Sequence, residues 1–153
     1  MDIAHEHVMA VGHVTRALRP TDQEITVPIA SDLDIVTARQ WGRTLASQRG
    51  YSPTEATLIA TAISELARNI VLYAKRGEIV LASANDGPKQ GIVVVARDEG
   101  PGIADVSRAI ADGYSTSGGL GLGLSGVRRL MDEFEISSEL GKGTTVTIKR
   151  WKR

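Results

Sequence analysis

An alternating run of glycines that leads into a helix constrains this chain most. Residues 118–126 read Gly-Gly-Leu-Gly-Leu-Gly-Leu-Ser-Gly, and a helical pattern covers residues 120–131. Glycines at this spacing let backbone N–H groups reach an anion, and the helix dipole adds positive potential. The letters match the dinucleotide fingerprint, but the run follows a long loop instead of a strand and leaves only about 30 residues after it. The glycine run therefore predicts a phosphate-binding site, but in a fold other than the doubly wound dinucleotide-binding fold. It is not a P-loop either, since no Gly-Lys-Ser/Thr follows.

The composition argues against nucleic acid and membrane as partners. The chain has 153 residues, with 18 Lys plus Arg against 18 Asp plus Glu, and its aromatic content is 4%. A neutral chain with few aromatic side chains lacks the basic surface and the stacking platform of a nucleic-acid-binding protein. No apolar run approaches the roughly 20 residues of a membrane-spanning helix. With no cysteine and no signal peptide, we expect a cytoplasmic protein.

Hydrophobic periodicity predicts an α/β fold of two layers, with a mixed or antiparallel sheet and helices on one face. The predicted strands cover residues 24–30, 78–84, 91–98, 134–138 and 144–149. The predicted helices cover residues 32–50, 53–75 and 120–131, and the pattern allows a short one over 105–112. The second helix has the strongest start, because Ser52, Pro53 and Glu55 form a capping box with proline at its first position.

We expect one catalytic domain over residues 23–153, preceded by an N-terminal extension over residues 1–22. The apolar stretch from Val8 to Val14 is compatible with a short strand. His5, His7 and His13 raise a metal site as an alternative, but no partner stands at a ligand spacing. A frayed terminus explains these histidines better.

Two polar positions combine with the glycine run. Glu65 and Asn69 lie one helical turn apart, which on its own fits a solvated face equally well. Asp98 ends a continuous apolar strand and is followed by Gly100 and Gly102, a pattern that fits either a ligand site at a sheet edge or a simple turn. The loop over residues 99–119 is long enough to be functional, and residues 141–144 fit a hairpin turn before the last strand.

The order and spacing of these motifs resemble the N, G1 and G2 boxes and the terminal Gly-Thr of the GHKL ATPase superfamily. The segments over residues 64–70, 114–121 and 127–134 are similar to the RsbT-type serine/threonine switch kinases of the bacterial stressosome. The similarity extends over about residues 24–151. It implies the Bergerat fold, in which ATP binds between helices and a flexible lid, here expected over residues 104–119.

The resemblance implies ATP and Mg²⁺ as ligands. Asn69 would supply the metal ligand, and Asp98 would accept a hydrogen bond from the adenine N6 amino group, which guanine lacks. Glu65 would take the proton of the substrate hydroxyl or orient it. Gly100 and Gly102 would leave room for the base, and Thr144 would support the adenine side. The implied nucleotide-binding residues are Asn69, Asp98, Gly100, Gly102, Ser115, Thr116, Gly119, Gly121, Gly123 and Thr144.

Two classes of function follow from the resemblance. The first is a protein kinase that phosphorylates Ser or Thr on a STAS-domain scaffold or antagonist, leaves it, and then activates a phosphatase. The second is an anti-sigma-factor-like binding module, in which ATP organises an interface. The presence of both Glu65 and Asn69 favours turnover over binding alone.

Overall fold

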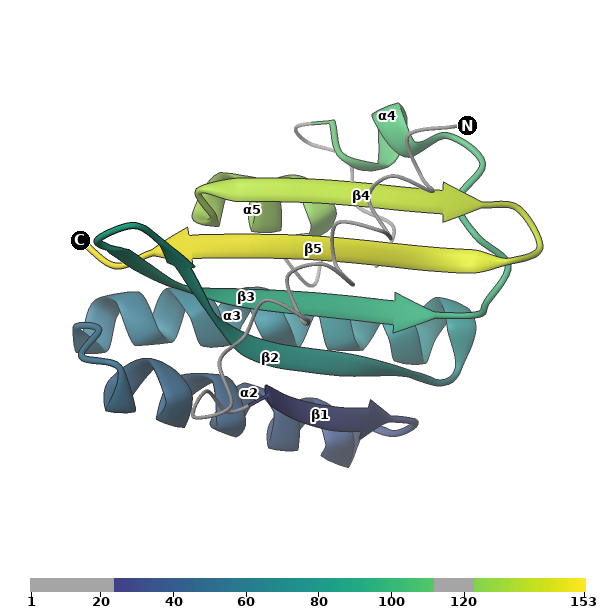
Figure 1. The fold of residues 1–153 in the computed structure, drawn as a ribbon. Coiled ribbons are helices and arrows are strands. Elements are labelled where there is room, and N and C mark those ends of the chain that lie inside the picture. The colour runs from purple at the N-terminus through teal and green to yellow at the C-terminus, as the bar shows by residue number, and fades with distance from the viewer. Residues whose placement is uncertain (1–23, 112–122) are drawn as a thin grey trace.

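A computed structural model describes residues 24–111 and 123–153 of the chain. Five strands form one sheet in the order β1-β2-β3-β5-β4, and helices α2, α3 and α5 lie together behind it (Figure 1). The strands are β1 (Glu24–Ile29), β2 (Gly77–Asp86), β3 (Lys89–Asp98), β4 (Glu133–Glu139) and β5 (Gly143–Trp151). The helices are α2 (Asp32–Gln48), α3 (Pro53–Asn69), the π-helix η1 (Ile70–Ala74), α4 (Val106–Ala109) and α5 (Gly123–Leu130). The predicted two-layer α/β fold is confirmed.

Every strand pairing is antiparallel, so the antiparallel alternative is correct and no parallel pair is present among the described strands. The turn predicted at Asp86 and Gly87 joins β2 to β3, and Gly87 has a φ of 60°. Both strands of this hairpin are longer than periodicity predicted, because their exposed ends lack alternation. The register places Asp98 of β3 opposite Thr144 of β5.

Helix α3 begins as predicted, but its capping differs in one respect. Ser52 Oγ accepts a hydrogen bond from the backbone N–H of Glu55 at 3.1 Å. The capping-box prediction expects the Glu55 carboxylate to accept a hydrogen bond from the backbone N–H of Ser52. The carboxylate instead faces Arg150 at 3.7 Å and Arg153 at 3.9 Å. Arg150 near the end of β5 and Arg153 just after it attract the carboxylate more strongly than one neutral N–H group does.

The predicted helix over residues 53–75 changes form before it ends. The α-helix stops at Asn69, and residues Ile70–Ala74 continue as a π-helix. Lys75 then ends the segment with a φ of 73°, a value that is uncommon for a residue with a side chain. Single π turns often occur at functional sites, and this one lies beside Asp98.

The main core lies between the helices and one face of the sheet. The inward residues of β2, β3 and β5 alternate with outward ones, and α3 contributes the apolar stripe expected from its sequence. Its largest fully buried side chains are Ile29, Leu45, Ile59, Ile63, Leu66, Ile70, Ile79, Leu81, Ile92, Ile148, Val94 and Val127. In the described part of the chain, no helix is long and apolar enough to cross a membrane.

Candidate functional site

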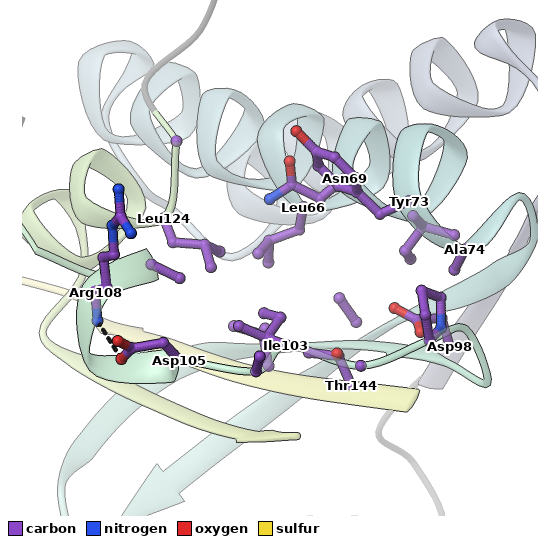
Figure 2. Close-up of a pocket in the computed structure, with 18 residues that line it drawn as sticks. Leu66, Asn69, Tyr73, Ala74, Asp98, Ile103, Asp105, Arg108, Leu124 and Thr144 are labelled. Atoms are coloured by element: carbon purple, nitrogen blue, oxygen red, sulfur yellow. Dashed lines mark hydrogen bonds between the residues drawn. The ribbon is translucent and has the colours of Figure 1, made fainter. Parts of the chain in front are cut away.

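A cavity of about 420 Å³ opens between helix α3 with η1 on one side and the sheet with the segment over residues 101–109 on the other (Figure 2). The start of α5 forms one end of it. Of the residues predicted from the sequence, Asn69, Asp98, Gly102, Gly123 and Thr144 line this cavity. Residues as far apart in the chain as Asn69 and Thr144 therefore meet around one space, whose volume falls in the range of small-molecule sites.

Asp98 lies at one end of the cavity, close to Ala74 (Figure 2). Its Oδ1 accepts a hydrogen bond from the backbone N–H of Gly100 at 2.9 Å. Burial raises the pKa of Asp98 above its ordinary value, although the N–H groups of Gly100 and Thr144 donate to the carboxylate and oppose this effect. The carboxylate is thus held in place by backbone donors while its remaining acceptor capacity faces the cavity.

The three glycines around Asp98 are required by contacts within the protein. A Cβ at Gly100 would lie 2.5 Å from Ala74 Cβ, and a Cβ at Gly102 would collide with Glu139 O. At Gly143, a Cβ would collide with Asp98 O. These glycines let the loop after β3 pass close to η1 and to the β4–β5 hairpin. Gly100 is not among the residues that line the cavity, so room for the base at this position stays a prediction.

Thr144 joins the cavity wall through a small network of hydroxyl groups. Thr144 Oγ1 lies 2.9 Å from Ser138 Oγ, and Ser138 Oγ accepts a hydrogen bond from the backbone N–H of Ile103 at 2.7 Å. Ser138 thus ties the loop that carries Ile103 to the β4–β5 hairpin. Sequence reasoning missed Ser138, because a serine near the end of a strand carries no recognisable signal.

Asn69 at the end of α3 and Tyr73 in the π turn lie on the helical side of the cavity, across from Asp98 and Thr144 (Figure 2). Asn69 is half-buried, and Tyr73 is 43% exposed. The Asn69 carboxamide offers an oxygen of the kind that Mg²⁺ accepts. In the described residues, no three His, Cys, Asp or Glu side chains gather to hold a metal ion. A metal at Asn69 would therefore need further ligands from phosphates and water.

Glu65 precedes Leu66, a residue that lines the cavity, but is not itself a lining residue. It is 5% exposed. Its Oε1 accepts a hydrogen bond from Arg68 Nη1 at 2.7 Å, and its Oε2 accepts one from the backbone N–H of Gly123 at 3.3 Å. Both oxygens therefore have partners, and one partner is the first residue of α5. Sequence reasoning placed Glu65 beside Asn69 but missed the Arg68 pair.

Gly123 is the part of the glycine run that the structure describes. It starts α5 with a φ of 67° and lines the cavity. Arg108 and Leu124 lie at this same end, opposite Asp98 (Figure 2). Ser115, Thr116, Gly119 and Gly121 lie outside the described residues, as does the second half of the expected lid, residues 112–119. Arg108 was missed by sequence reasoning, since the pattern around it shows only a short amphipathic turn.

A match to known proteins decides the family. Residues 54–153 match the family described as histidine kinase-, DNA gyrase B-, and HSP90-like ATPase. The chain belongs to this ATPase family. It is 50% identical over 127 residues to the serine/threonine-protein kinase RsbT of Bacillus subtilis, a match that covers 83% of this chain and 96% of RsbT. It is also 32% identical over 112 residues to the anti-sigma F factor of a Thermoanaerobacter species, covering 69% of this chain and 77% of that protein.

Solved structures agree with the fold. A crystal structure of the RsbU and RsbW domains of a Mycobacterium tuberculosis protein matches with a TM-score of 0.58 and 24% identity. That match covers 86% of this chain, which spans 33% of the longer structure. The mycobacterial sensor histidine kinase MprB matches 87% of this chain with a TM-score of 0.51 and 14% identity. At these identities the likeness shows the shared fold.

Proposed function

We propose that this ATPase-family chain is a serine/threonine protein kinase that works by partner switching. One observation carries the proposal: the cavity joins a half-buried carboxylate at one end to Asn69, Gly123 and Arg108 toward the other. The 50% identity to RsbT over most of both chains supports the same reaction class. A phosphoryl group would move from ATP to a Ser or Thr hydroxyl of a protein substrate.

The charges of the cavity match the polarity of ATP. Asp98 at one end offers an acceptor to the adenine N6 amino group, and the same carboxylate would repel guanine O6, which is also an acceptor. Arg108 and the N-terminus of α5 at the other end offer positive potential to the triphosphate. Asn69, between them, would hold Mg²⁺, which neutralises charge on the transferring phosphate when it is bound.

We propose that Glu65 acts on the substrate hydroxyl, and its contacts indicate when its carboxylate becomes available. With Arg68 on Oε1 and Gly123 N–H on Oε2, the carboxylate is held at the wall where α5 begins. A phosphate that engages the N–H of Gly123 would take this donor from Glu65 and leave Oε2 available for the substrate hydroxyl. Glu65 would then take the hydroxyl proton or orient the hydroxyl for attack.

We propose a STAS-domain scaffold or antagonist as the substrate and a phosphatase as the second partner. Both come from the resemblance to RsbT-type switch kinases. Phosphorylation adds about 1.5 to 2 negative charges to the substrate. The Glu65 carboxylate lies beside Gly123 at the phosphate end of the cavity, so like-charge repulsion would weaken the complex after transfer and release the kinase to its second partner. ATP as the phosphoryl donor is consistent with a cytoplasmic location.

The second candidate function is a binding module in which ATP organises an interface, favoured by the 32% identity to an anti-sigma F factor. The test compares Glu65→Gln with Glu55→Gln. Both residues are on α3, but Glu55 faces Arg150 and Arg153, away from the cavity. We expect Glu65→Gln to keep ATP binding and to lose transfer to a STAS-domain substrate, and Glu55→Gln to keep both.

A pull-down with the STAS-domain substrate, with and without Mg-ATP, separates the two functions. The kinase proposal predicts that ATP releases the wild type and Glu55→Gln from the substrate, but not Glu65→Gln. Equal release of Glu65→Gln and the wild type would show that nucleotide binding alone drives dissociation. That result would favour the binding module.

A further inference from the structure

The last turn of helix α3 carries a cation beside the two polar side chains of the site. Arg68 lies three positions after Glu65 and directly before Asn69. Unlike Asn69, it is not among the residues that line the cavity. The Arg68 side chain is 37% exposed, whereas that of Glu65 is 7% exposed. The guanidinium group therefore reaches the buried carboxylate from a partly exposed position outside the cavity lining.

The two oxygens of the Glu65 carboxylate have unequal partners. Arg68 Nη1 donates to Oε1 at 2.7 Å, and the backbone N–H of Gly123 donates to Oε2 at 3.3 Å. A charged hydrogen bond of the first length is stronger than a neutral one of the second length. The strong contact is made within one helix, whereas the weak one crosses to α5. Oε1 is therefore held firmly, and Oε2 is the oxygen that can exchange its partner.

The exchange makes the Arg68 contact more important. Gly123 lines the cavity at its phosphate end, and a phosphate that takes its N–H group would leave Oε2 without this donor. A buried carboxylate without a partner is unfavourable, and a paired cation offsets this cost. Arg68 would then remain as the charged partner. Its contact with Oε1 would also restrict rotation of the carboxylate, so that Oε2 stays directed toward the start of α5.

We propose that Arg68 is a positioning residue for phosphoryl transfer: it holds Oε1 of Glu65 so that Oε2 is presented to the substrate hydroxyl. The proposal rests on the proposed function, since it requires Glu65 to act on that hydroxyl. Arg68 itself contacts neither ATP nor the substrate in this scheme. Its loss should therefore slow the transfer step and leave nucleotide binding intact.

Transfer kinetics with Mg-ATP and the STAS-domain substrate, together with calorimetric ATP binding, test this role. We expect Arg68→Ala to lower kcat roughly 100-fold, as a misplaced catalytic group does, and to leave the KM and the Kd for ATP unchanged. The matched control is Arg97→Ala, which removes an ion pair of the same 2.7 Å length, between Arg97 and Glu78, outside the cavity lining. We expect Arg97→Ala to retain the wild-type kcat.

Two rescue measurements separate positioning from a purely structural role. Arg68→Lys should retain part of the kcat that Arg68→Ala loses, because an ammonium group carries the charge but only as a point donor. Millimolar guanidinium chloride should raise the kcat of Arg68→Ala, since the Arg68 side chain occupies a partly exposed position that a small cation can reach. The same salt should not raise the kcat of Glu65→Gln, which lacks the carboxylate that the cation would hold.

Three results would overturn the positioning role and leave the proposed function standing. The first is a wild-type kcat in Arg68→Ala while Glu65→Gln has lost transfer. The second is a loss of ATP affinity in Arg68→Ala as large as its loss of kcat, which would show that Arg68 supports the fold of α3. The third is a kcat that neither lysine nor guanidinium improves over Arg68→Ala. Absence of transfer by the wild type would instead refute the proposed function, and the positioning role with it.

Discussion

Two carboxylates lie beside opposite ends of strand β5, Asp98 at the end of β3 and Asp132 just before β4, and their environments are opposite. Near its start, Asp98 pairs in register with Thr144, lines the cavity and has a pKa raised by burial. Near its end, Asp132 accepts hydrogen bonds from Trp151 N at 2.7 Å and from Arg153 Nη2 at 2.6 Å. Burial raises the pKa of Asp132 too, but these donors outweigh it and hold the pKa below its ordinary value.

From this difference we expect the Asp98 end of the sheet to serve ligand binding and the Asp132 end to serve stability. Around Asp132, the carboxylate has a cationic partner in the protein, so its charge stabilises the fold. The Asp98 carboxylate, in contrast, accepts hydrogen bonds from backbone N–H groups. Among the described contacts, no arginine or lysine balances its negative charge. A carboxylate kept in this state is available to a ligand, and substitutions at the two ends should separate the two effects.

The largest expected effect is on ATP binding in Asp98→Asn. Losing one charged hydrogen bond costs about 1.5–3 kcal/mol, which corresponds to a roughly 10- to 150-fold weaker Kd. Preference for ATP over GTP should fall at the same time. Isothermal titration calorimetry with both nucleotides measures this. Equal affinity of the wild type for ATP and GTP would contradict the role of Asp98 in base selection.

The same variant should not lose stability. Because the folded-state pKa of Asp98 is raised, its contribution to stability is present below the ordinary pKa and is lost as pH rises through the folded value. At neutral pH the ionised group therefore opposes folding, and Asp98→Asn should be at least as stable as the wild type. Urea unfolding at pH 7 provides the comparison, and a marked loss of stability would show that the charge itself supports the loop.

A smaller and opposite effect is expected for Asp132→Asn. This variant should retain ATP affinity and lose about 1 kcal/mol of stability at neutral pH, since its partner Arg153 is partly exposed. The folded-state pKa of Asp132 is lowered, so its contribution is present above the ordinary value of 3.8 and is lost as pH falls through the folded value. Unfolding curves between pH 7 and pH 3 should therefore be flatter in the variant. A loss of ATP affinity would contradict the separation of the two ends.

An effect no larger than that of Asp132→Asn is expected for Tyr51→Phe, near the Asp132 end. Tyr51 Oη donates a hydrogen bond to Arg150 O at 2.8 Å, and its loss should cost about 1 kcal/mol. Burial, followed by the nearby Glu55 charge, raises the pKa of Tyr51 to about 12 from 10.0. Its contribution to stability is full below pH 10 and is lost as pH rises through 12. Urea unfolding at pH 8 and pH 11 should show a smaller alkaline loss in Tyr51→Phe than in the wild type.

Prediction from the sequence succeeded where a local pattern was sufficient. The β2–β3 hairpin follows from two apolar runs around Asp86 and Gly87, and the start of α3 follows from Ser52 and Pro53. Prediction was incomplete where residues distant in the chain bind a side-chain carboxylate that the local pattern had assigned to a nearby partner. Glu55 faces arginines almost 100 positions away instead of its own cap, and Glu65 pairs with Arg68 and with a backbone N–H 58 residues away.

By itself, the sequence determined the element order and the motifs, because periodicity and glycine spacing are local properties. The grouping of Asn69, Asp98 and Thr144 around one site was implied by the family resemblance, and the structure places all three around one cavity. Only the tertiary structure decided the π turn at Ile70–Ala74 and the close contacts that require Gly100 and Gly143. These depend on which atoms meet across the fold. A chain encodes such contacts through many weak packing preferences at once, and no single segment carries them.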